Sequence, residues 1–103
     1  MAKWGGVTGC FRIGQAILAG ERTYCPHFLG GGIGLIASGH LLAATGGDGL
    51  LEVDVNANPL RDVFFPEGMC KEGFFPITDA PGLGFEELPG ELAQYRTLEL
   101  SRH

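Results

Sequence analysis

A run of apolar residues at helical spacing constrains the fold of this chain most, because it lies between two short β-prone segments. The run covers residues 32–45, and its repeating residues are Ile33, Ile36, Ala37, His40, Leu41 and Ala44. This spacing predicts an amphipathic helix. β-prone residues precede it at 22–25, and alternating apolar and acidic residues follow it at 50–55. The order strand, helix, strand predicts a parallel pair joined by a right-handed crossover.

A second helix is predicted before this unit. Apolar residues recur at helical spacing between Thr8, a suitable N-cap, and Gly20, a natural C-terminal stop. We therefore expect a helix over residues 9–19.

Prolines change the character of the chain beyond residue 56. They stand at positions 59, 66, 76, 81 and 89. A helix longer than about two turns cannot run through such a segment. We predict an irregular tail, with a short strand near residues 73–77 and a short helix near residues 90–95.

Size and charge exclude several classes of protein. A chain of 103 residues suits one small domain. The net charge is −5 and no basic cluster occurs, which argues against a nucleic-acid partner. No apolar run approaches the roughly 20 residues that a membrane span needs. The first residues lack the apolar core of a signal peptide, so we expect a cytoplasmic protein.

The cysteines do not predict a metal site or a disulfide framework. Cys10, Cys25 and Cys70 are odd in number, and no two form a CxxC pair. Cys25 and His27 could be two zinc ligands, but no second pair follows. We expect free thiols that are buried or half-buried.

Polar residues follow or end both predicted strands of the central unit. In parallel α/β folds, ligands bind at the carboxyl ends of the strands. His27 lies at that end of the first strand, and Glu52 and Asp54 lie toward that end of the second. The glycine loop at 30–34 opens a helix at the same edge and favours an anion. This set suits general acid–base chemistry on a small carboxylate or phosphate compound.

Plainer interpretations of the same residues remain open. His27 can be a surface or hydrogen-bonded structural histidine, and His40, on the apolar helix face, is expected to pack in the core. Glu52 and Asp54 can be solvated residues of an edge strand. The glycines can simply allow tight loop packing.

The glycine loop also fits a nucleotide-binding motif. Residues 32–37 match G-x-G-x-x-G/A, and Asp54 follows at about the 20-residue distance of a ribose-binding acid. Against this, Pro26 and His27 separate the loop from the preceding strand.

Five motifs occur in an order that resembles a known enzyme family. They are Lys3-x-Gly5-Gly6-Val7-Thr8-Gly9, Pro26-His27, His40-Leu41-Leu42-Ala43-Ala44-Thr45, Leu51-Glu52 and Asp79-x-Pro81-Gly82-Leu83-Gly84. The order resembles the carboxyl-terminal part of the mandelate racemase/muconate lactonizing enzyme family, within the enolase superfamily. The run from Asn56 to Arg61 recurs in acid-sugar dehydratases of that group. The resemblance extends from Lys3 to about Tyr95.

The resemblance implies an α/β fold, the C-terminal βαβαβ portion of a modified (β/α)7β TIM barrel with an irregular proline-rich tail. Residues 1–103 would be a single segment, with barrel units over 1–56 and a tail over 57–103 that packs toward a capping domain absent from this chain. The barrel elements would be the sixth strand end and its loop at 1–7, the sixth helix at 9–19, the seventh strand at 22–26, the seventh helix at 32–45 and the eighth strand at 50–54.

The resemblance also assigns roles to three residues. His27 matches a histidine that acts as general acid or base, and Glu52 matches a glutamate that hydrogen-bonds the substrate carboxylate or enediolate. Lys3 matches a lysine near the end of the sixth strand. The family removes the proton α to a carboxylate with the help of Mg²⁺, and the products arise by dehydration or racemisation.

The carboxylate metal ligands and the lysine base of the family lie on earlier strands, so we expect no metal site in this chain. The resemblance therefore implies a C-terminal fragment of a lyase or isomerase that is inactive alone. Its substrate, once the barrel is completed, would be a small carboxylate or acid sugar, and open sheet edges would favour self-association. The alternatives are a non-catalytic remnant, or a phosphate- or nucleotide-binding module that uses the loop from Gly30 to Gly34.

Overall fold

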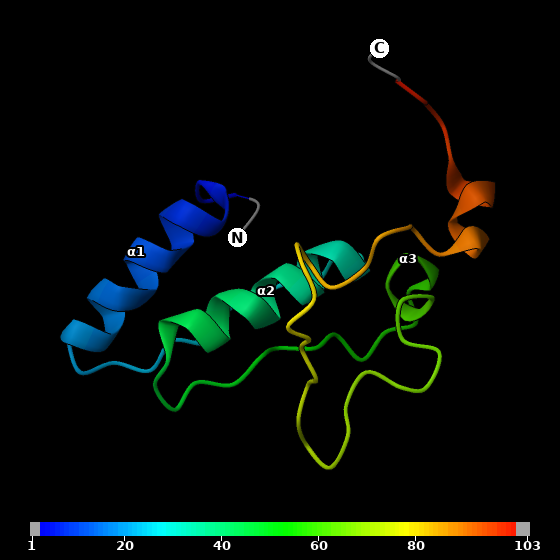
Figure 1. Ribbon diagram of the computed structural model, residues 1–103. Helices are drawn as coiled ribbons and strands as arrows, with labels where there is room; N and C mark the ends of the chain where they lie inside the picture. The colour runs from blue at the N-terminus through cyan, green and yellow to red at the C-terminus, as the bar shows by residue number, and fades with distance from the viewer. Residues whose placement is uncertain (1–2, 101–103) are drawn as a thin grey trace.

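Two helices of 14 residues each pack side by side. The computed structural model describes residues 3–100. Its elements are α1 (Gly6–Ala19), α2 (Gly32–Thr45), the short helix α3 (Pro59–Asp62) and the 3-10 helix η1 (Gly90–Tyr95). Loops run along α2, part of the loop between α3 and η1 projects away from it, and the segment after η1 extends away from the body (Figure 1).

Helix α1 begins three residues earlier than predicted and ends where predicted. Its N-cap is Gly5, so Thr8 lies inside the helix and does not cap it. At its end, the N–H of Gly20 donates to the carbonyls of Ala16 and Ile17. Residues 3–5 form a turn, and residues 1 and 2 of the expected sixth strand lie outside the described residues.

The contact between α1 and α2 is close because a glycine faces α2. A Cβ on Gly14 would lie 2.8 Å from Cγ2 of Thr45, so only glycine lets the helices approach this far. The buried hydrophobic residues of the described chain are Cys10 on α1 and Leu35, Ala37 and Leu41 on α2. The core is small.

Helix α2 has the predicted bounds, but the predicted buried face is only partly right. Ala37 and Leu41 are buried as expected, whereas Ile33 and Ala44 are exposed. The helix is apolar nearly all round, so its periodicity does not single out one face. Ser38 is fully buried instead, because its hydroxyl donates to the carbonyl of Gly34 at 2.8 Å.

The predicted α/β fold, the βαβαβ portion of a barrel, is wrong for this structure. Residues 3–100 contain no strand and no sheet. Residues 22–26 and 50–54 are irregular, and residues 73–77 form no strand either. The β-bridge found there, Lys71 with Phe74, only closes a tight turn.

The two segments expected to be strands nevertheless lie beside one another in a constant register. Side-chain contacts join residues 25 positions apart, namely Thr23 to Asp48, Cys25 to Leu50 and His27 to Glu52. The amide of Leu50 donates to the sulfur of Cys25 instead of a carbonyl. Parallel strands are stable mainly in sheets covered on both faces. Here Leu50 and Val55 are 75% and 97% exposed, so water competes for the backbone groups that a ladder would use.

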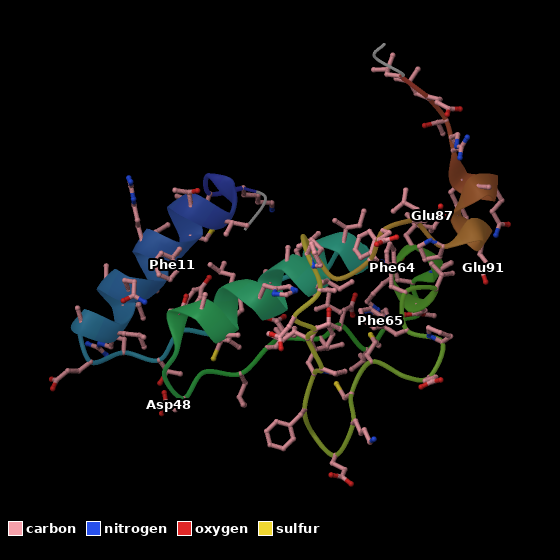
Figure 2. All side chains as sticks on the ribbon, in the orientation of Figure 1. Phe11, Asp48, Phe64, Phe65, Glu87 and Glu91 are labelled. Carbon is pink, nitrogen blue, oxygen red and sulfur yellow. The ribbon has the colours of Figure 1, made fainter. Side chains whose placement is uncertain are left out.

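The proline-rich tail is irregular as predicted, and η1 confirms the short helix near residues 90–95. Aromatic rings fix part of the tail. The ring of Phe64 packs edge-to-face on Phe85 at a centroid distance of 5.3 Å, and Phe65 packs on Phe75 at 5.5 Å. Phe64 and Phe65 lie in the loop that follows α3, near α2 (Figure 2). No helix within residues 3–100 is long and apolar enough to cross a membrane.

Candidate functional site

His27 and Glu52 meet where the two adjacent extended segments end. Nδ1 of His27 lies 2.8 Å from Oε2 and 2.9 Å from Oε1 of Glu52. The side chains are 69% and 43% exposed, so substrate or solvent can reach the pair. The structure thus brings together two of the residues that the sequence singled out, because the segments that carry them lie side by side with a constant offset of 25 residues.

The contact fixes which ring nitrogen is available for chemistry. An ionised carboxylate only accepts hydrogen bonds, so Nδ1 of His27 donates to it. In the neutral ring, Nε2 then carries the lone pair and can accept a proton. The pair can therefore take up and release a proton at one defined atom.

An open cavity of about 600 Å³ lies beside His27. It lies between the start of α1 and residues 24–30, and Lys3, Trp4 and Tyr24 are among its lining residues. Lys3 and His27 therefore face one space, whereas Glu52 does not line it. Burial raises the pKa of the Tyr24 phenol, and Cys10 raises it further. That phenol stays protonated at neutral pH and can serve as a hydrogen-bond donor.

Asp54, proposed from sequence as a second carboxylate at this edge, is used locally. Its Oδ1 accepts hydrogen bonds from the backbone N–H and the side-chain amide of Asn56, at 3.0 and 2.8 Å. The backbone hydrogen bond from Asn56 is the main cause that lowers the pKa of Asp54. Asp54 thus stabilises a turn as an ionised group.

The glycine loop at 30–34 is used for packing. The ring of Phe28 lies against Gly30 and Gly34, and the ring of Phe64 lies against Gly32, so closely that any Cβ there would collide. This confirms the plainer interpretation of the glycines, as residues that allow tight packing.

The other residues singled out from sequence have simple positions. Among the thiols, Cys10 is buried as expected, whereas Cys25 and Cys70 are exposed, contrary to the prediction. His40 is half-buried, and its Nε2 has no hydrogen-bond partner among the residues that the structure describes. It lines a second cavity of about 390 Å³ between α2 and the tail.

The described residues do not fit a magnesium site. Mg²⁺ requires several oxygen ligands in near-octahedral geometry. No group of three or more His, Cys, Asp or Glu residues that could hold a metal ion occurs within residues 3–100.

Two residues of the run from Asn56 to Arg61 have structural roles that the sequence analysis did not assign. Arg61 is only 4% exposed, and its guanidinium donates to the carbonyls of Asp54 and Asn56. Asn58 caps α3. The dipeptide Asn58-Pro59 is a signal for a helix start that could have predicted α3. Burial of an arginine depends on tertiary partners and has no comparable signal.

Comparison with known proteins gives a consistent result. A family model described as enolase C-terminal domain-like matches residues 1–88. The arabinonate dehydratase of Saccharolobus solfataricus is 31% identical to this chain over 93 residues, which are 89% of this chain and 25% of that protein. The chain thus spans about a quarter of the length of that relative. No solved structure gives a significant match.

Proposed function

The chain belongs to the enolase C-terminal domain-like family, and on this premise we propose that it supplies the acid–base pair of an acid-sugar dehydratase. The observation that carries the proposal is the contact of 2.8 Å between Nδ1 of His27 and the carboxylate of Glu52. The similarity to an arabinonate dehydratase supports an acid sugar as the substrate class.

In the proposed reaction, Nε2 of His27 takes the proton from the carbon next to the substrate carboxylate. The same nitrogen then gives this proton to the hydroxyl on the neighbouring carbon, which leaves as water. One C–H and one C–O bond break and a C=C bond forms, giving an enol that rearranges to a 2-keto acid. Glu52 orients the ring, and the resemblance assigns to this residue a hydrogen bond with the substrate carboxylate or enediolate.

Lys3 and the cavity beside His27 complete the part of the site that we assign to this chain. The ammonium group of Lys3 suits the carboxylate of the substrate, and the cavity of about 600 Å³ falls in the usual size range of small-molecule sites. Enolase-superfamily enzymes typically use Mg²⁺, which would stabilise the charge that develops when the proton leaves. We propose that its ligands come from residues outside this chain.

Three further expectations remain part of the proposal. We place the protein in the cytoplasm. We expect the chain to be inactive until residues equivalent to the rest of the relative are supplied. We also expect some self-association, because the exposed extended segments leave backbone groups free to pair with another chain.

Reconstitution tests the proposed function. The chain would be co-expressed with the part of the arabinonate dehydratase that it does not match, and 2-keto acid formation from a panel of acid sugars would be measured with Mg²⁺ present. We expect turnover with at least one acid sugar. His27→Asn should reduce it about 100-fold or more, which is the usual contribution of a general acid or base.

His40→Asn is the matched control, since it alters an imidazole that lines the other cavity. It should leave turnover close to that of the unsubstituted chain. Absence of turnover with every acid sugar, or full turnover by the His27→Asn variant, would contradict the proposal.

A further inference from the structure

The short helix α3 contacts the loop that follows His27. The side-chain oxygen of Asn58 caps α3 by accepting from the N–H of Leu60 at 3.1 Å, and its Nδ2 donates to the carbonyl of Gly30 at 3.4 Å. The carbonyl of Leu60 lies so close to Gly31 that a Cβ there would be 3.1 Å from the oxygen. One side of α3 therefore packs against the backbone of Gly30 and Gly31, which follows His27.

The other side of α3 holds the backbone that follows Glu52. Nη1 of Arg61 donates to the carbonyl of Asp54 and Nη2 to the carbonyl of Asn56, both at 2.8 Å. Because the guanidinium is a planar fork, two such bonds fix both the position and the direction of this backbone.

Asp62 connects these two halves and balances the buried charge. Its Oδ1 lies 2.9 Å from Nε of Arg61, and its Oδ2 accepts from the N–H of Asn58 at 3.0 Å. The hydrogen bond from the backbone of Asn58 and that from the side chain of Arg61 lower the pKa of Asp62, which keeps it ionised. Asn58, Arg61 and Asp62 form one polar unit, which we call the α3 clamp.

We infer that the α3 clamp positions His27 against Glu52. The side-chain hydrogen bonds between the two extended segments are made by exposed groups, and no strand ladder joins the segments within residues 3–100. The buried hydrogen bonds of Arg61 are stronger constraints than exposed pairs. That this positioning serves catalysis rests on the proposed function, whereas the positioning of His27 against Glu52 does not.

Nuclear magnetic resonance of the full chain tests the inference without turnover. The readout is the NOE between the His27 ring protons and the γ-methylene of Glu52. Asn58→Asp keeps a capping oxygen on α3 but removes the amide that donates to Gly30, and Arg61→Lys keeps the charge but removes the fork. We expect each substitution to abolish the NOE while the signals of α1 and α2 persist.

Two matched controls make the same chemical changes away from the clamp. Gln94→Glu replaces an amide in η1, and Arg96→Lys replaces an exposed arginine paired with Glu99. Both should retain the NOE.

The NOE persisting in folded Asn58→Asp and Arg61→Lys variants would overturn the inference. So would loss of the α1 and α2 signals together with the NOE in the Asn58→Asp variant, because the clamp would then serve only the fold. In the reconstituted enzyme, Asn58→Asp should lower kcat with little change in KM. Because the NOE requires no activity, failure of the dehydratase proposal would leave the clamp result intact.

Discussion

The α1–α2 pair and the two extended segments are held by different forces. Helix α1 packs on α2 where Gly14 lies against Thr45, and α2 carries the most deeply buried leucines of the described residues, Leu35 and Leu41, each only 1% exposed. The segments that carry His27 and Glu52 are joined by polar contacts and by the α3 clamp. The fold therefore depends mainly on apolar packing and the candidate site mainly on hydrogen bonds, so substitutions should be able to damage one and spare the other.

The largest loss of stability is expected from the helix pair. Leu41→Ala removes a buried side chain and leaves a cavity, which should lower the free energy of unfolding by about 2–4 kcal/mol. Chemical denaturation measures the effect. Leu50→Ala, at an exposed position of the second extended segment, is the control and should change stability by no more than about 0.5 kcal/mol. Equal losses of stability in the Leu41→Ala and Leu50→Ala variants would show that packing does not distinguish the two regions.

A smaller loss is expected from the clamp. Arg61→Met leaves the carbonyls of Asp54 and Asn56 without their donors, which should lower the free energy of unfolding by about 1–3 kcal/mol. The matched variant, Arg96→Met, removes an exposed side chain and should have little effect. An Arg61→Met variant as stable as the unsubstituted chain would show that the buried guanidinium does not stabilise this part of the fold.

Acid should weaken the polar region before the helix pair. Backbone hydrogen bonds from Asn56 and Asn58 are the main causes that lower the pKa values of Asp54 and Asp62 in the folded chain. A lowered pKa stabilises the fold fully above the unfolded value of about 3.9, and this contribution is lost as the pH falls toward the folded value. Denaturation at several pH values should therefore show that the free energy of unfolding falls below about pH 4. In the Asp62→Asn variant it should fall less steeply than in the unsubstituted chain. Identical pH dependence of the two proteins would contradict this role.

The smallest effect on stability is expected at the pair itself. Glu52→Gln removes the charge of an exposed carboxylate, and exposed ion pairs contribute little. The free energy of unfolding should change by no more than about 0.5 kcal/mol, whereas turnover of the reconstituted enzyme should fall. A large stability loss would show that the pair is a structural contact.

The sequence predicted the parts of this molecule that local patterns determine. Glycines bound α2 on both sides, so its ends were found, and prolines excluded long helices from the tail. The alternation in residues 50–55 put Glu52 on the polar side of its segment, and in the structure Glu52 contacts His27. The strands were wrong because a ladder depends on covered faces, which no local pattern reports. Arg61 was missed because its burial is decided by carbonyls that reach it only in the folded chain.

The most direct test of the central claim is to measure which nitrogen of the neutral His27 ring carries the proton. If Nδ1 donates to Glu52, long-range ¹H–¹⁵N spectra of the neutral ring should show a protonated Nδ1 and an unprotonated Nε2. In Glu52→Ala this preference should be lost. A neutral His27 whose proton lies on Nε2 in the unsubstituted chain would contradict the account, since the nitrogen assigned to take the substrate proton would already carry one.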